Sequence, residues 1–227
     1  MSWLRSWKLC SVRPKALDGV PGWEKRRLRR AAWLIPPGNA FLHALGAGCR
    51  MLGAGWLDYE RSVFRLTHPD LPLPRVPGPG ALWLPHVSGV EVRTLPGDEM
   101  RRAAISAFAE LGRFHRLGER SLHGDPHAGN FLFDAAEDRC RLIDFETDVP
   151  VSMSPAQGRA RDFMILALDL WRQGAGSRAD LTVWREAHGM NEDDCKVDDL
   201  IHRPGLALEI YWRWLGYRMP ARDGDPC

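Results

Sequence analysis

The residues best suited to chemistry lie in one stretch, SLHGDPHAGNFLFDAAEDRCRLIDFETD, at positions 121–148. In it Asp125 is followed by Asn130 and then, after a turn between two short apolar runs, by Asp144. Phosphoryl transfer needs a divalent metal ion that offsets phosphate charge and a group that orients the attacking hydroxyl. Carboxylate and amide oxygens are ligands that Mg²⁺ prefers. The stretch therefore predicts a metal–phosphate site built from these three residues.

His123 belongs to the same set because of the order in which the residues occur. Protein kinases carry the pattern H-x-D-x-x-x-x-N followed by Asp-Phe-Gly. His123, Asp125 and Asn130 match the first part, and Asp144–Phe145 match the second. Each residue alone could cap a turn or end a strand. Together they predict catalytic roles for Asp125 and His123, with Asn130 and Asp144 as metal ligands.

The segment HGDPHAGN (123–130) resembles the catalytic loop of the aminoglycoside and choline kinase-type phosphotransferases and of the lipopolysaccharide (Kdo/heptose) kinases. It is also similar to the atypical kinases of coenzyme-Q biosynthesis. The resemblance implies that Asp125 orients the substrate hydroxyl or accepts its proton, that Asn130 and Asp144 hold Mg²⁺, and that ATP is the phosphate donor. It also implies that Asp162, in RARDFMILALDLW, braces the loop; a surface position is the alternative.

The amino-terminal half resembles the same kinases through YERSVFRLTHPDLPLPRV (59–76). This segment is similar to their glutamate-containing helix, which implies that Glu60 pairs with a phosphate-binding lysine. Lys8 lies in the most strand-like context and is preferred for that role, and Lys15 comes next. Lys25 lies in a run of arginines and is expected to be solvated.

Several features depart from the kinase pattern. Lys8 and Glu60 are far apart, which requires an insertion between strand and helix, and Glu24 is a rival partner for the lysine. No G-x-G-x-x-G loop precedes Lys8, and Glu146 replaces the glycine of Asp-Phe-Gly. The sequence therefore predicts an abbreviated amino-terminal lobe or a chain that lacks its true start. A pseudokinase, or nucleotide-binding scaffold without catalysis, is the alternative function.

The elements that must position these residues are predicted from periodicity and turn residues. Apolar residues at helical spacing predict an amphipathic helix over 98–117, with Ile105, Phe108 and Leu111 on the core face and Asp98 as its N-cap. The same reasoning predicts strands at 3–12, 81–87 and 139–145, and further helices at 23–34, 56–67, 156–173 and 206–217.

The order of elements predicts an α+β, bilobal protein-kinase-like fold with an abbreviated amino-terminal lobe and a mostly helical carboxy-terminal lobe. Residues 1–92 are expected to form the nucleotide-binding lobe, with a basic helical insertion, and residues 93–227 the catalytic lobe. The expected function is ATP- and Mg²⁺-dependent transfer of phosphate to a hydroxyl of a small-molecule or lipid-linked sugar acceptor. An atypical protein kinase is a further alternative.

The composition of the chain limits which classes of partner it is expected to bind. The balance of 31 basic against 29 acidic residues argues against nucleic-acid binding. The amino-terminal 60 residues are basic and rich in tryptophan, which fits an anionic ligand, a membrane surface or a solvated helix face. Five scattered cysteines without a C-x-x-C pair indicate neither a disulfide framework nor a zinc site. The sequence predicts a cytoplasmic protein, with peripheral contact at the inner face of the membrane left open.

Overall fold

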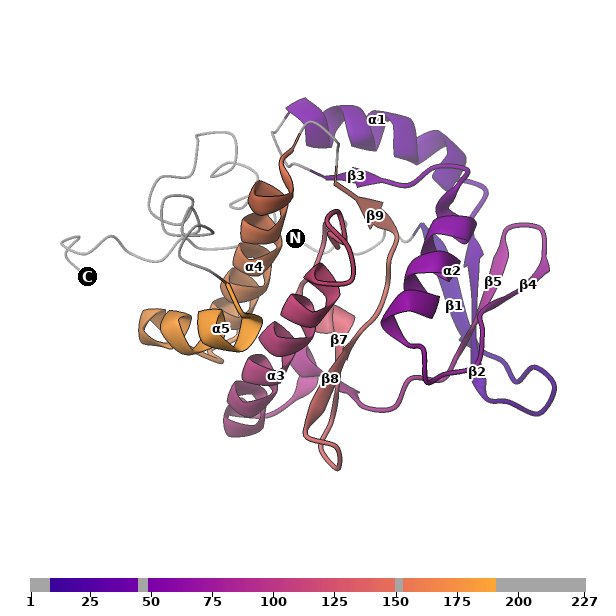
Figure 1. Cartoon of the computed structure of the whole chain (residues 1–227). Helices are drawn as coiled ribbons and strands as arrows, with labels where there is room; N and C mark the ends of the chain where they lie inside the picture. Colours follow the sequence, from indigo (N-terminus) through magenta and orange to yellow (C-terminus); the bar gives the residue numbers. More distant parts are fainter. Residues whose placement is uncertain (1–8, 45–48, 150–152, 191–227) are drawn as a thin grey trace. The chain divides into compact units, whose positions relative to one another are not determined.

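The computed structural model describes residues 9–44, 49–149 and 153–190 (Figure 1). The helices of this part are α1 (Ala31–Ala44), α2 (Trp56–Thr67), α3 (Gly97–His115), α4 (Pro155–Arg172) and α5 (Leu181–His188). The strands are β1 (Cys10–Pro14), β2 (Gly22–Arg27), β3 (Arg50–Met51), β4 (Arg75–Gly78), β5 (Ala81–Pro85), β6 (Val90–Glu91), β7 (Phe131–Asp134), β8 (Arg139–Leu142) and β9 (Thr147–Asp148). The predicted α+β composition is confirmed.

The chain separates into two compact units. The first contains the chain up to Phe41, then Met51–Val87 and Asp144–Glu146, and the second contains the rest. The first unit thus includes Asp144–Glu146, a short segment from the middle of the predicted catalytic lobe, and the second includes Leu42–Arg50, from within the predicted amino-terminal lobe. The division after residue 92 and the assignment of one function to each lobe stay predictions.

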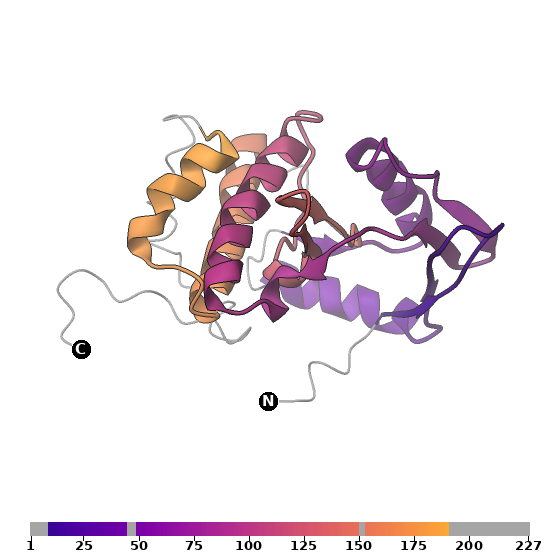
Figure 2. The same ribbon diagram turned by 90° about the horizontal axis from the view of Figure 1, so that it is seen from below.

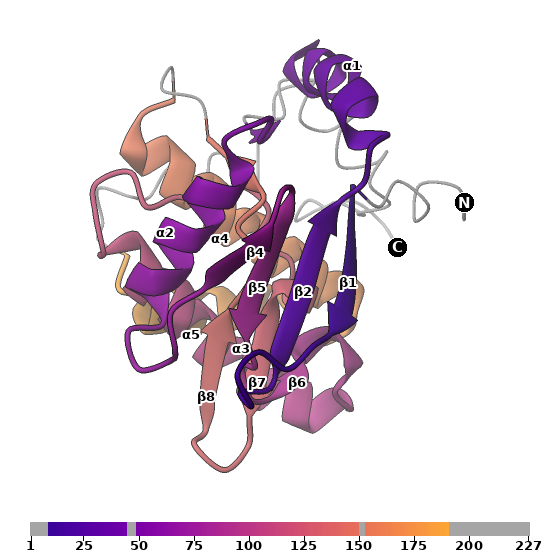
Figure 3. The ribbon, with the colours of Figure 1, turned by 90° about the vertical axis from the view of Figure 1, so that its right-hand side faces the viewer.

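The first unit contains an antiparallel sheet in the order β1-β2-β5-β4 (Figure 3). In the β2–β5 ladder Gly22 lies opposite Pro85, and a Cβ at Gly22 would lie only 2.4 Å from the carbonyl oxygen of Leu84. β2 can therefore approach β5 this closely only because it begins with glycine. The buried core of this unit includes Cys10, Trp56 and Leu82, and α2 packs against β5.

The predicted helix over 23–34 is wrong. Residues Gly22–Arg27 form strand β2, and a helix, α1, begins only at Ala31. The basic run offers a helix-like pattern locally, but pairing with β1 on one side and β5 on the other satisfies the backbone of 22–27. Tertiary pairing therefore overrides the local preference.

In the second unit α3 packs against α4, α5 and β8, while β6, β7 and β8 form a small antiparallel sheet (Figure 2). The core face of α3 carries Ala104, Phe108 and Leu111, at helical spacing. Ile105, predicted to face the core, is instead 43% exposed. Pro96, not Asp98, stands at the N-cap.

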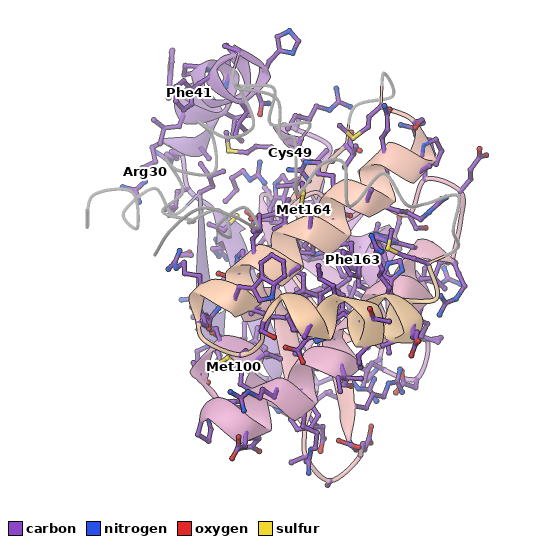
Figure 4. The ribbon with its side chains drawn as sticks, turned by 90° about the vertical axis from the view of Figure 1, so that its left-hand side faces the viewer. Arg30, Phe41, Cys49, Met100, Phe163 and Met164 are labelled. Atoms are coloured by element: carbon purple, nitrogen blue, oxygen red, sulfur yellow. The ribbon has the colours of Figure 1, made fainter. Side chains whose placement is uncertain are left out.

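α4 is buried along most of its length. It begins with a capping box, in which Ser154 Oγ accepts from the N–H of Gln157 and Gln157 Oε1 accepts from the N–H of Ser154. Phe163 and Met164 of this helix are fully buried (Figure 4). A helix with apolar residues on nearly every side is a core element. None of the described helices is long and apolar enough to cross a membrane.

The other predicted elements have mixed outcomes. The helices at 56–67, 98–117 and 156–173 and the strands at 81–87 and 139–145 are confirmed as α2, α3, α4, β5 and β8. The predicted helix at 206–217 and most of the predicted strand at 3–12 lie outside the described residues.

Candidate active site

A buried lysine on β2 is the centre of the site in the first unit. Lys25 Nζ lies 2.8 Å and 3.0 Å from the two carboxylate oxygens of Glu60 on α2. The same nitrogen lies 2.5 Å from Asp144 Oδ1 and 2.8 Å from Glu146 Oε1. The Lys25 side chain is 7% exposed and that of Glu60 is completely buried. The lysine that pairs with Glu60 is therefore Lys25.

This pairing corrects the sequence-based ranking of the lysines. Lys25 was expected to be solvated, and Lys15, a candidate partner of Glu60, instead forms an ion pair with buried Glu24. Successive side chains of a strand point to opposite faces, so neighbouring Glu24 and Lys25 belong to different faces of β2. Lys8 lies outside the described residues. No local signal could have found Lys25, because its partners come from distant parts of the chain.

Three carboxylates around one ammonium leave this cluster with excess negative charge. Burial raises the pKa of Glu60 to about 7; the charges of Asp144 and Glu146 add to this rise, and Lys25 opposes it. Burial alone would lower the pKa of Lys25, but the carboxylates, Glu60 foremost, raise that pKa well above its usual value. Lys25 is therefore a permanent cation at neutral pH.

The donor set of this cluster fits a hard divalent cation. The Asp144 carboxylate is 45% exposed and that of Glu146 is 19% exposed, so both can reach a ligand. Within residues 9–44, 49–149 and 153–190, no group of three His, Cys, Asp or Glu side chains is arranged to hold a metal ion. Mg²⁺ is commonly held by only one or two carboxylates together with substrate phosphates. The excess negative charge fits an ion bound in that way.

Asp144 has an unusual backbone conformation. Its φ of 68° lies in the left-handed region, which non-glycine residues seldom adopt, although aspartate tolerates it better than most. Such strain persists only where the surrounding structure imposes it, and it is frequent at functional sites. The conformation and the contact with Lys25 both mark Asp144 as a functional candidate.

In the second unit, residues 123–130 form a hydrogen-bonded loop that leads into β7. Asn130 Nδ2 donates to the carbonyl oxygen of Asp125 at 2.9 Å, so the amide oxygen of Asn130 is the atom able to bind a cation. The N–H of Ile143 donates to the carbonyl oxygen of Asn130 at 2.9 Å, next to the antiparallel pairing of β7 with β8. The Asp125 carboxylate is 51% exposed and accessible to a substrate.

Both ring nitrogens of His123 are hydrogen-bonded to backbone groups. Its Nε2 lies 3.0 Å from the carbonyl oxygen of Ile143, and its Nδ1 accepts from the N–H of Asp125 at 3.3 Å. The residue is 1% exposed. These contacts hold the loop in shape and leave no ring nitrogen for a substrate.

Two buried aspartates of α4 accept hydrogen bonds from this loop. Asp162 accepts from the N–H of His123 at 2.7 Å and from that of Gly124 at 3.1 Å, so its bracing role is confirmed and the surface alternative is wrong. Asp169 accepts from the N–H of Ala128 at 2.8 Å, and sequence reasoning missed it. The available signal was its spacing: seven residues are two helical turns, which puts both carboxylates on one face of an apolar helix.

Comparison with known proteins gives a sparse result. No protein-family model matches the chain, and no curated protein matches it. Among solved structures, 24 chains match. One of them, described as "WaaP in complex with acyl carrier protein", is 17% identical with a TM-score of 0.45; the match covers 92% of this chain and 85% of that one. The function is therefore inferred from the residues of the chain itself.

Proposed function

We propose that the chain is an ATP- and Mg²⁺-dependent phosphotransferase whose nucleotide site includes Lys25, Glu60 and Asp144. The observation that carries the proposal is the buried ion pair of Lys25 with Glu60, together with the contact of Lys25 with Asp144. Kinases use a strand lysine paired with a helix glutamate, and the Asp of Asp-Phe-Gly binds Mg²⁺. Lys25 on β2 and Glu60 on α2 are such a pair, and Asp144–Phe145 matches the Asp-Phe dipeptide.

In the proposed reaction, a residue of the second unit acts on the hydroxyl of the acceptor. Asp125 accepts the proton of the acceptor hydroxyl as that oxygen forms a bond to the γ-phosphorus, while the bond from phosphorus to the β-phosphate oxygen breaks and ADP leaves. Asn130 and Asp144 are the proposed Mg²⁺ ligands, and the ion would offset the charge of the phosphates. His123 positions the loop that carries Asp125.

The proposed acceptor is a small molecule or a lipid-linked sugar. The surface of α1 favours the lipid-linked sugar. On α1, Trp33 is 83% exposed and Phe41 is 45% exposed, and the exposed arginines Arg29 and Arg30 directly precede the helix. Exposed aromatic residues beside basic ones are typical of segments that rest on anionic lipid surfaces. We therefore place α1 at a membrane surface, where a lipid-linked acceptor is found.

The test of the proposal replaces the central lysine. Lys25→Met removes the cation that would contact the phosphates, whereas Lys15→Met removes a lysine that pairs with Glu24 only. In the wild type, Mg·ATP at a hundred times its Kd should stabilise the fold by about 2.7 kcal/mol. Thermal unfolding should show this gain in the wild type and in Lys15→Met but not in Lys25→Met. Transfer of the γ-phosphate to a panel of sugar and lipid-linked acceptors should follow the same order.

Lys25→Met leaves three carboxylates without a counter-ion, so a second variant guards against simple unfolding. Lys25→Arg keeps the positive charge but not the compact ammonium, and it should fold while losing most of the transfer activity. The proposal fails if folded Lys25→Arg and Lys25→Met respond to Mg·ATP as the wild type does. Binding of Mg·ATP without transfer to any acceptor would favour the scaffold alternative, which the lack of a G-x-G-x-x-G loop before Lys25 suggests.

A further inference from the structure

A chain of buried side chains joins the end of α5 to the loop that carries Asp125. His188, the last residue of α5, has Nε2 2.9 Å from Nδ1 of His115 at the end of α3. His115 Nε2 in turn lies 3.2 Å from Asp162 Oδ2. That oxygen also accepts from the N–H of His123. The exposed fractions of His188, His115 and Asp162 are 3%, 5% and 0%.

The direction of these hydrogen bonds follows from the chemistry of the groups. An ionised carboxylate only accepts, so His115 Nε2 must carry the proton that it donates to Asp162. A neutral His115 then has a bare Nδ1, and His188 Nε2 must donate to it. His188 Nδ1 is left bare, and it has no hydrogen-bond partner among the described residues. The reverse arrangement would need a charged His115 and would leave a buried N–H of His188 without an acceptor, which costs more.

The electrostatic surroundings agree with a neutral His188. Burial lowers the pKa of His188 to about 3, and the neighbouring charge of Arg116 acts in the same direction. The Asp162 pKa is lowered: burial would raise it, but the hydrogen bond from His115 and the positive charge of Arg161 outweigh that effect. The acceptor at one end is therefore ionised and the donor at the other is neutral.

The end of α5 lies very close to α3, and this contact fixes the geometry of the hydrogen-bonded row His188–His115–Asp162. A Cβ at Gly112 of α3 would lie 1.9 Å from the carbonyl oxygen of His188. The same carbonyl accepts from Arg116 Nη1 at 2.8 Å. The position of the His188 ring is thus set by backbone contact, not by side-chain packing alone.

We infer that His188 and His115 are positioning residues, which connect the docking of α5 to the shape of the catalytic loop through Asp162. Asp162 accepts from four donors, two of them loop N–H groups. The histidine pair fixes the orientation of this carboxylate, and the carboxylate holds the backbone N–H groups of His123 and Gly124, the two residues that precede Asp125. The inference rests on the proposed function for the role of Asp125, whereas the hydrogen-bond chain stands without it.

The test compares two replacements of His188 that differ in one hydrogen bond. His188→Gln keeps an N–H donor close to the position of Nε2, and His188→Leu removes the donor at similar volume. Amide hydrogen exchange at His123 and Gly124, measured by NMR, should be about 10-fold faster in His188→Leu and within about 2-fold of wild type in His188→Gln, in keeping with the worth of one buried hydrogen bond. Amides of the β7–β8 hairpin should not change.

Activity provides a second readout. Misplacing a catalytic group slightly lowers turnover without weakening nucleotide binding, so kcat should fall about 10-fold in His188→Leu with the KM for ATP unchanged, and His188→Gln should restore it. Leu181→Ala, at the opposite end of α5, is the matched control for loss of helix packing. It should leave both loop amides and kcat near the wild-type values.

Each outcome decides a different point. If His188→Gln exchanges as fast as His188→Leu, or if Leu181→Ala has the same effect, the inference is overturned and α5 acts through packing alone. The ring tautomers in the wild type give a variant-independent check: both His115 and His188 should carry their proton on Nε2, and a proton on Nδ1 of either ring would contradict the chain. The expected exchange pattern without phosphate transfer would reject the proposed function and keep the inference.

Discussion

At the scale of single residues, Glu60 is the carboxylate of the Lys25 cluster whose pKa is raised. Its pKa of about 7 reflects complete burial beside two other carboxylates, with Lys25 as the opposing cation. A glutamate in this position holds its proton more tightly in the folded protein than in the unfolded chain. Its contribution to stability is therefore complete at low pH and is lost as the pH rises.

We expect Glu60→Gln to remove a pH-dependent part of the stability. Between the ordinary pKa of 4.5 and the folded value of about 7, the unfolded chain releases the Glu60 proton first. As the pH rises through this range, the unfolding free energy of the wild type should therefore fall relative to that of Glu60→Gln, by up to about 3 kcal/mol in total. The difference between the two proteins should be constant above pH 7. Urea titrations of both proteins across this range measure it. A difference that does not vary with pH would contradict the perturbed Glu60.

At the scale of elements, the packing of α3 on α5 depends on one small residue. The close approach of Gly112 to His188 leaves no room for a side chain. By contrast, Gly97 at the start of α3 has no atom within 4 Å of the place where its Cβ would lie. The two glycines thus separate the effect of contact from the general preference of helices for alanine.

Gly112→Ala should destabilise the fold, because α5 must shift to make room for the methyl group. Overpacking of this kind costs about 1–3 kcal/mol, which exceeds the roughly 0.5–1 kcal/mol that alanine gains over glycine in a helix. The matched variant Gly97→Ala should be neutral or slightly stabilising. Urea unfolding of the two variants gives the comparison, and equal stabilities would show that α5 does not dock as described.

At the scale of the whole molecule, the proposed contact of α1 with lipid is measurable without knowledge of the acceptor. The protein should sediment with vesicles that contain anionic lipid and less with neutral vesicles, and added salt should weaken the binding. A double change of Trp33 and Phe41 to serine should lower the partition coefficient by at least about 10-fold, since each buried apolar side chain contributes roughly 1.5–3 kcal/mol.

Trp23→Ser supplies the control for this experiment. Trp23 is 40% exposed but belongs to strand β2 and not to α1. Its replacement should leave vesicle binding unchanged. If the serine variant of α1 binds as well as the wild type, the membrane proposal is wrong, and the acceptor must be sought among soluble molecules.

The local sequence determined three of the described helices and the motif. Periodicity over ten to twenty residues predicted α2, α3 and α4, because burial of one face depends on spacing within the element itself. The order of Asp125, Asn130 and Asp144 predicted the kinase-like site because these residues sit within or beside one hairpin. The bracing role of Asp162 was expected only through the resemblance of its segment to kinases.

Only the tertiary structure decided which lysine is central. Lys25 lies 35 positions from Glu60 and 119 from Asp144, and its pairing with both depends on β2 being a strand between β1 and β5. A charged residue in a basic run has no local property that distinguishes burial from solvation. Its surroundings are set by long-range strand pairing and by the need to neutralise buried carboxylates, and neither is visible in the neighbouring sequence.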